Sequence, residues 1–101
     1  MTTLHIFNQG TLQSALLQRC IETMSHKDAL IFIEDGVVWA TDSPLTSQLL
    51  GKAPQNAGIY VLSEDLGARG LSELKAESVA VVDYNGFVEL TEQSQNTLSW
   101  F

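Results

Sequence analysis

Cys20, the single cysteine of the chain, is the residue best suited by type to act as a nucleophile. It lies in the segment LLQRCIETM, which runs from Leu16 to Met24. On a helical wheel with about 100° per residue, Cys20 falls in the middle of an apolar stripe. Helix N-termini and nearby cations favour thiolates, whereas Cys20 lies in the second half of the predicted helix. Its position favours a packing role, and a reactive role is the alternative if the stripe borders a cleft or a partner.

Carboxylates form a second group that could do chemistry, because they follow three apolar runs at the point where each ends. They are Glu34, Asp35, Glu64, Asp65 and Asp83. In open α/β sheets ligands bind at the carboxyl ends of the strands, where clustered carboxylates would suit Mg²⁺ or Ca²⁺. The alternative is that Asp35, Asp65 and Asp83 cap the helices that follow. The spacing matches no metal motif, and capping is the favoured interpretation.

Other catalytic and cofactor motifs are missing from the sequence. The two histidines, His5 and His26, do not have a zinc-binding spacing, and each is expected to be a surface or hydrogen-bonded residue. No GxGxxG or Walker lysine motif follows a strand, and no GxSxG elbow is present. We therefore expect neither a bound cofactor nor a metal ion.

Short apolar runs alternate with helical patterns along the chain. Strands are predicted at Leu4 to Phe7, Ala29 to Ile33, Ile59 to Leu62 and Val79 to Val82. Helices are predicted at Thr11 to Met24, Leu45 to Leu50, Glu64 to Ala68, and from Tyr84 towards Thr91, with Thr11 as an N-cap and Pro44 in the first turn of the second helix. Continuous apolar strands are typical of parallel sheets that are covered on both faces. The pattern predicts one α/β domain over residues 1–101, a three-layer sandwich with a mostly parallel sheet of four to five strands.

The last residues of the sequence are less regular. The polar segment from Glu92 to Thr97 is interpreted as a turn, and LSWF, Leu98 to Phe101, is an apolar end that requires a partner surface.

Composition excludes several classes of partner. The net charge is −7, which disfavours direct binding to nucleic acid or to an anionic membrane surface. No apolar run approaches the roughly 18 residues of a membrane span, and no signal peptide is recognised. One cysteine cannot form an internal disulfide, so the expected compartment is the reducing cytoplasm.

Three sequence blocks resemble the DsrH/TusB family of small sulfur-relay subunits. They are the EDGV unit within Ile33 to Val37, EDLGARG at Glu64 to Gly70, and VDYNGFVELT at Val82 to Thr91. The blocks occur in order, and the similarity runs essentially from end to end. The resemblance implies an α/β fold and a heterohexamer built with two homologous subunits, one TusC/DsrF-like and one TusD/DsrE-like. It also implies that sulfur moves as a cysteine persulfide, mainly on a partner subunit, between upstream and downstream carrier proteins.

The resemblance leaves two branches open for function. The first is 2-thiolation of the tRNA wobble uridine, and the second is dissimilatory sulfur oxidation with a DsrH-type subunit. A cysteine in the first helix resembles the DsrH type, in which it is proposed as a secondary sulfur site. The chain is therefore expected to be a non-catalytic or auxiliary subunit, and a self-sufficient sulfurtransferase using Cys20 is the alternative.

Four aromatic residues are candidates for subunit contacts, because aromatic side chains are enriched at protein interfaces. They are Trp39, Phe87, Trp100 and Phe101. The alternative for each is that it packs in the core of the chain.

Overall fold

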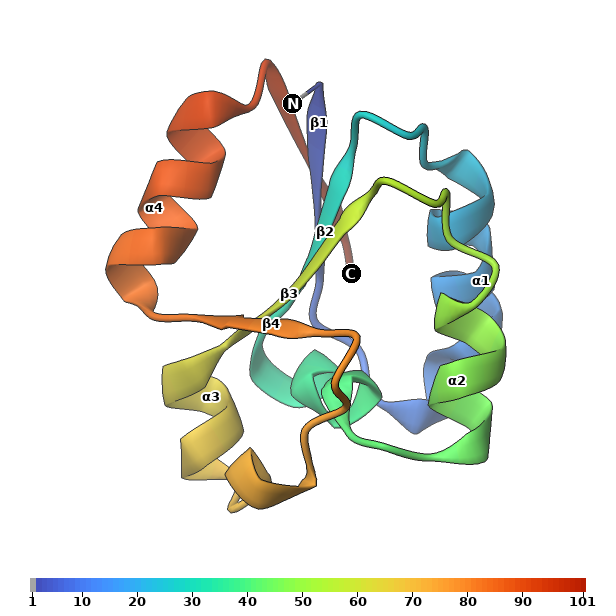
Figure 1. The fold of residues 1–101 in the computed structure, drawn as a ribbon, viewed down its shortest axis with the longest axis vertical. Helices are drawn as coiled ribbons and strands as arrows, with labels where there is room; N and C mark the ends of the chain where they lie inside the picture. Colours follow the sequence, from blue (N-terminus) through green and yellow to red (C-terminus); the bar gives the residue numbers. More distant parts are fainter. Residues whose placement is uncertain (1) are drawn as a thin grey trace.

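A five-stranded parallel sheet forms the centre of the protein (Figure 1), as seen in a computed structural model that describes residues 2–101. The strand order is β4-β3-β2-β1-β5, and every neighbouring pair is parallel. The strands are β1 (Thr3–Phe7), β2 (Ala29–Phe32), β3 (Gly58–Leu62), β4 (Ala80–Val82) and β5 (Asn96–Trp100). All four residues of β2 are buried, as expected for a central strand covered on both faces.

Helices cover both faces of this sheet. The α-helices are α1 (Ser14–Thr23), α2 (Pro44–Leu50), α3 (Ser63–Ala68) and α4 (Tyr84–Gln93). The shorter 3-10 helices are η1 (Thr11–Gln13), η2 (Glu34–Ala40) and η3 (Ser72–Leu74). Figure 1 shows α1 and α2 on one side of the sheet and α4 on the other. The predicted three-layer α/β fold with a parallel sheet is confirmed.

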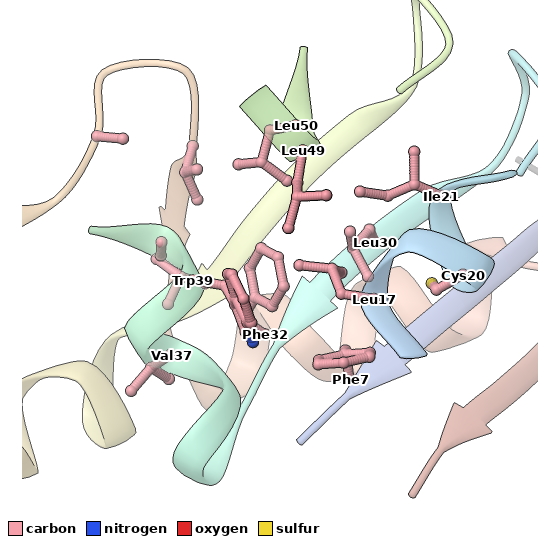
Figure 2. Close-up of a cluster of buried hydrophobic side chains, with 14 of the residues drawn as sticks. Phe7, Leu17, Cys20, Ile21, Leu30, Phe32, Val37, Trp39, Leu49 and Leu50 are labelled. Carbon is pink, nitrogen blue, oxygen red and sulfur yellow. The ribbon is translucent and has the colours of Figure 1, made fainter. Parts of the chain in front are cut away.

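Two apolar clusters hold the layers together, one on each face. The larger joins α1, α2 and η2 to alternate residues of the strands, including Phe7, Leu30 and Phe32 (Figure 2). The smaller joins α4 to the opposite face through Leu90, which packs with Leu4 and Ile31. Strand alternation explains this division, because successive side chains of a strand point to opposite faces.

The helix starts agree with the sequence prediction in one case and not in another. Ser43 caps α2 by accepting a hydrogen bond from the Thr46 N–H at 3.1 Å, and Pro44 occupies the first turn as predicted. The prediction of Thr11 as an N-cap was wrong. Thr11 begins the 3-10 turn η1, and no side chain caps either η1 or α1. The missing Glu or Gln of a capping box is consistent with this weaker start.

The predicted turn at Glu92 to Thr97 was also wrong at both of its ends. Helix α4 continues to Gln93, and β5 begins at Asn96. The sequence NTLSW has only two apolar residues, so its local pattern does not predict a strand. It becomes one because the free edge of β1 offers unpaired backbone groups, which pair Thr3 through Phe7 with Asn96 through Trp100. The partner surface expected for the apolar end is thus in part the chain's own first strand.

Candidate functional site

Cys20 lies inside the protein, on the face of α1 that packs against the sheet (Figure 2). Its side chain is 0% exposed and belongs to the same apolar cluster as Phe7, Leu17 and Ile21. Burial raises the pKa of the Cys20 thiol to about 12, and the negative charge of Asp28 adds to the effect. Since only the thiolate is a strong nucleophile, burial and the raised pKa both disfavour reaction of the thiol in this conformation. In the structure Cys20 packs in the core, which is the role that the helical wheel favours.

Asp28, which influences Cys20, is the centre of a buried polar network. Its carboxylate accepts hydrogen bonds from the N–H groups of Thr3 and Ser25 and from the Ser25 hydroxyl, at 3.1 to 3.2 Å. Its Oδ2 also lies 3.0 Å from Nε2 of His5, which is 1% exposed. Burial alone raises the pKa of Asp28, but the hydrogen bonds from Ser25 and His5 outweigh it and hold the pKa below its ordinary value. The loop before β2 is thereby fixed to β1.

His5 is also contacted by the last strand. The indole Nε1–H of Trp100 donates to His5 Nδ1 at 3.0 Å, and the two rings are 6.1 Å apart between centroids. An indole N–H can only donate, so Nδ1 carries the lone pair and Nε2–H donates to Asp28. The network Trp100–His5–Asp28 therefore connects β5, β1 and the α1–β2 loop in one tautomeric arrangement. The prediction that His5 is a hydrogen-bonded residue is confirmed, whereas His26 is exposed.

Among the acidic residues at the carboxyl ends of the strands, one behaves as the capping interpretation predicts. Asp83 Oδ1 accepts a hydrogen bond from the Gly86 N–H at 2.8 Å and so caps α4. Glu64 reinforces the same helix start, because its Oε2 accepts from the Tyr84 N–H at 3.1 Å. This hydrogen bond is the main cause that lowers the pKa of Glu64.

Asp35 and Asp65 do not cap the helices that follow them, so the capping prediction was wrong for both. Asp65 Oδ2 instead accepts from the Glu34 N–H at 2.6 Å, where Glu34 adopts a positive φ of 50°. Asp35 Oδ1 binds the guanidinium of Arg69, at 3.0 Å from Nη2. Both contacts join η2, which follows β2, to α3 and its C-cap Arg69, which follow β3. Within residues 2–101 no group of three or more His, Cys, Asp or Glu side chains is placed to share a metal ion.

A hollow of about 390 Å³ opens beside the end of β1. It is lined by Gln9, Gly10, Thr11, Leu12, Gln13 and Asp35. The strand order reverses at β1, since the chain proceeds from β1 through β2 and β3 to β4 and then returns to β5 on the other side. Ligands of open α/β sheets bind at such reversals. The lining offers amides, a hydroxyl and one carboxylate, and none of its side chains is a nucleophilic thiol or a cation.

The four candidate interface aromatics have different surroundings. Trp39 is 1% exposed, and its Nε1–H donates to the Gln9 carbonyl at 3.0 Å. Trp39 therefore packs in the core of the chain, which was the alternative to a subunit contact. Phe87 is half-buried against the smaller cluster, and Trp100 is half-buried beside His5. Phe101 is 72% exposed.

Comparisons with known proteins decide the family. The sequence model described as "DsrH like protein" matches residues 11–97 of the chain. The chain belongs to the DsrH-like family. The resemblance found in the sequence is thus confirmed, and the chain is a member of the TusB/DsrH sulfur-relay family.

Curated relatives of this DsrH-like chain carry the name Protein TusB. One from Pectobacterium parmentieri is 35% identical over 85 residues, which cover 83% of this chain and 86% of the relative. Another, from Klebsiella pneumoniae subsp. pneumoniae, is 38% identical over 80 residues, which cover 79% of this chain and 82% of the relative.

Solved structures share the fold of the DsrH-like chain. The ychN protein from E. coli superposes with a TM-score of 0.72 at 16% identity, covering 98% of this chain and 99% of that protein. Protein Tm0979 from Thermotoga maritima gives a TM-score of 0.68 at 27% identity, covering 90% and 92%. The first likeness is one of fold alone.

Sequence reasoning did not identify Asp28 or its contact with His5 and Trp100. His5 stands in an apolar run, and Asp28 immediately precedes another, ALIF. An ionisable residue at the start of a buried strand needs a partner, because an unpaired buried charge is costly. That signal was present, but it did not say which residue the partner would be.

Proposed function

We propose that this chain is an auxiliary subunit of a persulfide relay complex that supports 2-thiolation of the tRNA wobble uridine. Membership of the DsrH-like family and relatives named Protein TusB support the choice of relay and of branch. The observation that carries the auxiliary role is the burial of Cys20, the chain's only thiol. A subunit without an accessible thiol cannot itself receive a persulfide, so the acceptor cysteine must belong to another chain.

The partners in this proposal are two homologous subunits, TusC/DsrF-like and TusD/DsrE-like, assembled with this chain in a heterohexamer in the cytoplasm. Sulfur enters from an upstream carrier and leaves to a downstream one. The net charge of −7 supports a role without direct tRNA contact, because the tRNA backbone would be repelled. In residues 2–101 no helix is long and apolar enough to cross a membrane. Of the four candidate interface aromatics, Phe101 is the exposed one, and we assign it to a subunit contact.

A complementation experiment tests this function. The gene is deleted in its host, and plasmids restore wild type, Cys20→Ala or an empty vector. Nucleosides from total tRNA are then measured for 2-thiouridine by mass spectrometry. We expect 2-thiouridine to be lost in the deletion and restored by both wild type and Cys20→Ala, with two homologous chains co-purifying in equal ratio. Unchanged 2-thiouridine in the deletion strain would count against the tRNA branch.

A second candidate is a DsrH-type sulfur site on Cys20, within sulfur oxidation or in a self-sufficient sulfurtransferase. Two observations favour it: the matching family model is the DsrH one, and the cysteine lies in the first helix. Incubation of the isolated protein with a persulfide donor, followed by intact mass measurement, separates the two. A gain of about 32 Da, one sulfur atom, that is absent in Cys20→Ala would favour the second candidate.

A further inference from the structure

Strand β5 pairs with β1 along its whole length but buries little of its side-chain surface. It has one strand neighbour, β1, and its first four residues, Asn96 to Ser99, are exposed. Trp100 is the residue of β5 that reaches the interior, and it does so through its hydrogen bond to His5. Segments with few buried contacts open locally at a lower free energy than the core. Beyond its backbone pairing with β1, β5 is therefore held by Trp100 and its hydrogen bond to His5.

The ring of His5 can satisfy Trp100 in only one protonation state. With Nε2–H directed at Asp28, the Nδ1 lone pair accepts the indole N–H. A protonated imidazole has a donor at both nitrogens, so the indole N–H would face another N–H. The same proton would convert the Nε2–Asp28 contact at 3.0 Å into an ion pair, which strengthens that contact. Protonation thus strengthens the contact between His5 and Asp28 and weakens the contact between His5 and Trp100 of β5.

We propose that Trp100, His5 and Asp28 form a proton-sensitive latch, in which protonation of His5 at Nδ1 releases β5 from the edge of β1. The proton comes from solvent, and the released Trp100 N–H bonds to water. Opening would leave His5 paired with Asp28 and the β1 edge free for another strand. The latch does not depend on the proposed sulfur-relay function, so a test of one does not test the other.

Two titratable groups are linked to His5, Asp28 by direct contact and Cys20 through the charge of Asp28. Asp28 comes from the α1–β2 loop, and Cys20, which lies within range of the charge of Asp28, comes from α1. The residues opposite His5 in the sheet are Leu30 on β2 and Leu98 on β5, and neither is charged. Asp28 is ionised throughout the range in which an ordinary histidine titrates, because its pKa is lowered. The thiol of Cys20 is neutral there, because its pKa is raised to about 12. Neither Asp28 nor Cys20 therefore changes its charge in that range.

Nuclear magnetic resonance on the intact protein tests the latch. The ¹⁵N shifts of the His5 ring report its tautomer and protonation, and amide hydrogen exchange reports the docking of β5, between about pH 8 and pH 5. Exchange of β2 amides, corrected for intrinsic rates, is the internal reference. Trp100→Phe keeps an aromatic ring but removes the N–H donor.

We expect Nδ1 of His5 to be unprotonated at the higher pH. As the ring gains a proton, the protection of Leu98 to Trp100 amides should fall by about tenfold relative to β2, which corresponds to the loss of one buried hydrogen bond. In Trp100→Phe the protection of β5 should be lower at the higher pH and independent of the His5 charge. The latch is wrong if β5 protection stays constant while His5 becomes protonated, if the ring stays neutral until the whole chain unfolds, or if Trp100→Phe keeps the wild-type pH dependence. The ring shifts of the wild type decide the tautomer even if the variant does not fold.

Discussion

Asp28 Oδ2 and His5 Nε2 lie 3.0 Å apart in the interior, joining the start of β2 to the middle of β1. His5 lies in β1 and Asp28 directly precedes β2, the neighbour of β1 in the sheet, and both are buried, so their hydrogen bond is shielded from water. The carboxylate of Asp28 also holds the N–H groups of Thr3 and Ser25. This network is where substitution and pH should affect stability most clearly.

Replacing Asp28 with Asn should destabilise the fold. An amide offers one oxygen where the carboxylate offers two, and its NH₂ group would face a donor from Thr3, Ser25 or His5. Leaving a buried donor unpaired costs about 1–3 kcal/mol, which urea unfolding followed by circular dichroism would measure. Asp42→Asn is the matched control, because Asp42 is exposed. A loss for Asp28→Asn no larger than for Asp42→Asn would contradict the structural role.

The acid dependence of stability follows from the lowered pKa of Asp28. A group whose pKa is depressed by folding contributes stability above its unfolded pKa, ordinarily 3.8, and loses it as the pH falls through the lower folded value. As the pH falls from about 5, the stability difference between wild type and Asp28→Asn should shrink below the ordinary aspartate value. Urea midpoints of both proteins, measured from about pH 6 to pH 2.5, check this. A stability difference between wild type and Asp28→Asn that widens below the ordinary aspartate pKa would contradict the predicted direction of the pH dependence.

Cys20 should be unreactive in the folded protein. The pKa of about 12, against an ordinary 9.0, lowers the thiolate fraction at neutral pH by about a thousandfold, and burial blocks access as well. Ellman's reagent should label the native protein only at the rate at which it unfolds, and should label it fully in urea. Rapid native labelling would show that Cys20 is accessible and would favour the sulfur-site alternative.

Cys20 also makes stability sensitive to high pH. Because the pKa of the thiol is raised by folding, its contribution is complete below about pH 9 and is lost as the pH rises towards 12. Cys20→Ala should remove this part of the alkaline loss, at the cost of a small cavity worth about 1 kcal/mol. Thermal midpoints of wild type and variant between about pH 7 and pH 10.5 give the comparison. Parallel curves over the whole range would exclude the thiol as the cause.

Asp83→Ala should shorten or destabilise α4 by about 1 kcal/mol, because it removes the side chain that caps the helix at Gly86 N–H. The control is Glu89→Ala, an exposed change within the same helix. Thermal unfolding measures both. Equal stabilities for the two variants would mean that Asp83 does not act as a cap.

Phe101→Ala should weaken assembly with the homologous subunits and leave the stability of this chain nearly unchanged, because the ring is 72% exposed. If Phe101 is one of the few residues that dominate the interface, its truncation should cost more than about 1 kcal/mol, or about fivefold in affinity. Thr97→Ala, an exposed change in the same terminal stretch, is the control. Sedimentation or mass photometry of the co-expressed subunits gives the readout. Unaltered assembly would remove Phe101 from the interface.

The sequence predicted the strands with continuous apolar runs and missed the one without. ALIF and the run ending at Leu62 are continuously apolar, which predicts buried strands. The positions of β2 and β3 could therefore be predicted from the sequence alone. In β5, by contrast, Asn96, Thr97 and Ser99 are polar, and their pairing with β1 depends on a free edge elsewhere in the chain.

The acidic residues at the strand ends also show that local contacts can be predicted from the sequence and distant ones cannot. Asp83 caps the helix next to it, which is a local interaction, whereas Asp35 and Asp65 join η2 to α3 and its C-cap, which are far apart in the sequence.

The sequence by itself determined the parallel α/β class, the apolar stripe that buries Cys20, and the DsrH-like family, because periodicity, composition and short motifs are properties of neighbouring residues. Only the tertiary structure decided that Trp39 lies in the core and that β5 pairs with β1. It also decided that Trp100 meets His5 across 95 positions of the chain. Local patterns set which residues avoid water, while the identity of each buried polar partner depends on strand order and register, which bring together residues that the sequence keeps far apart.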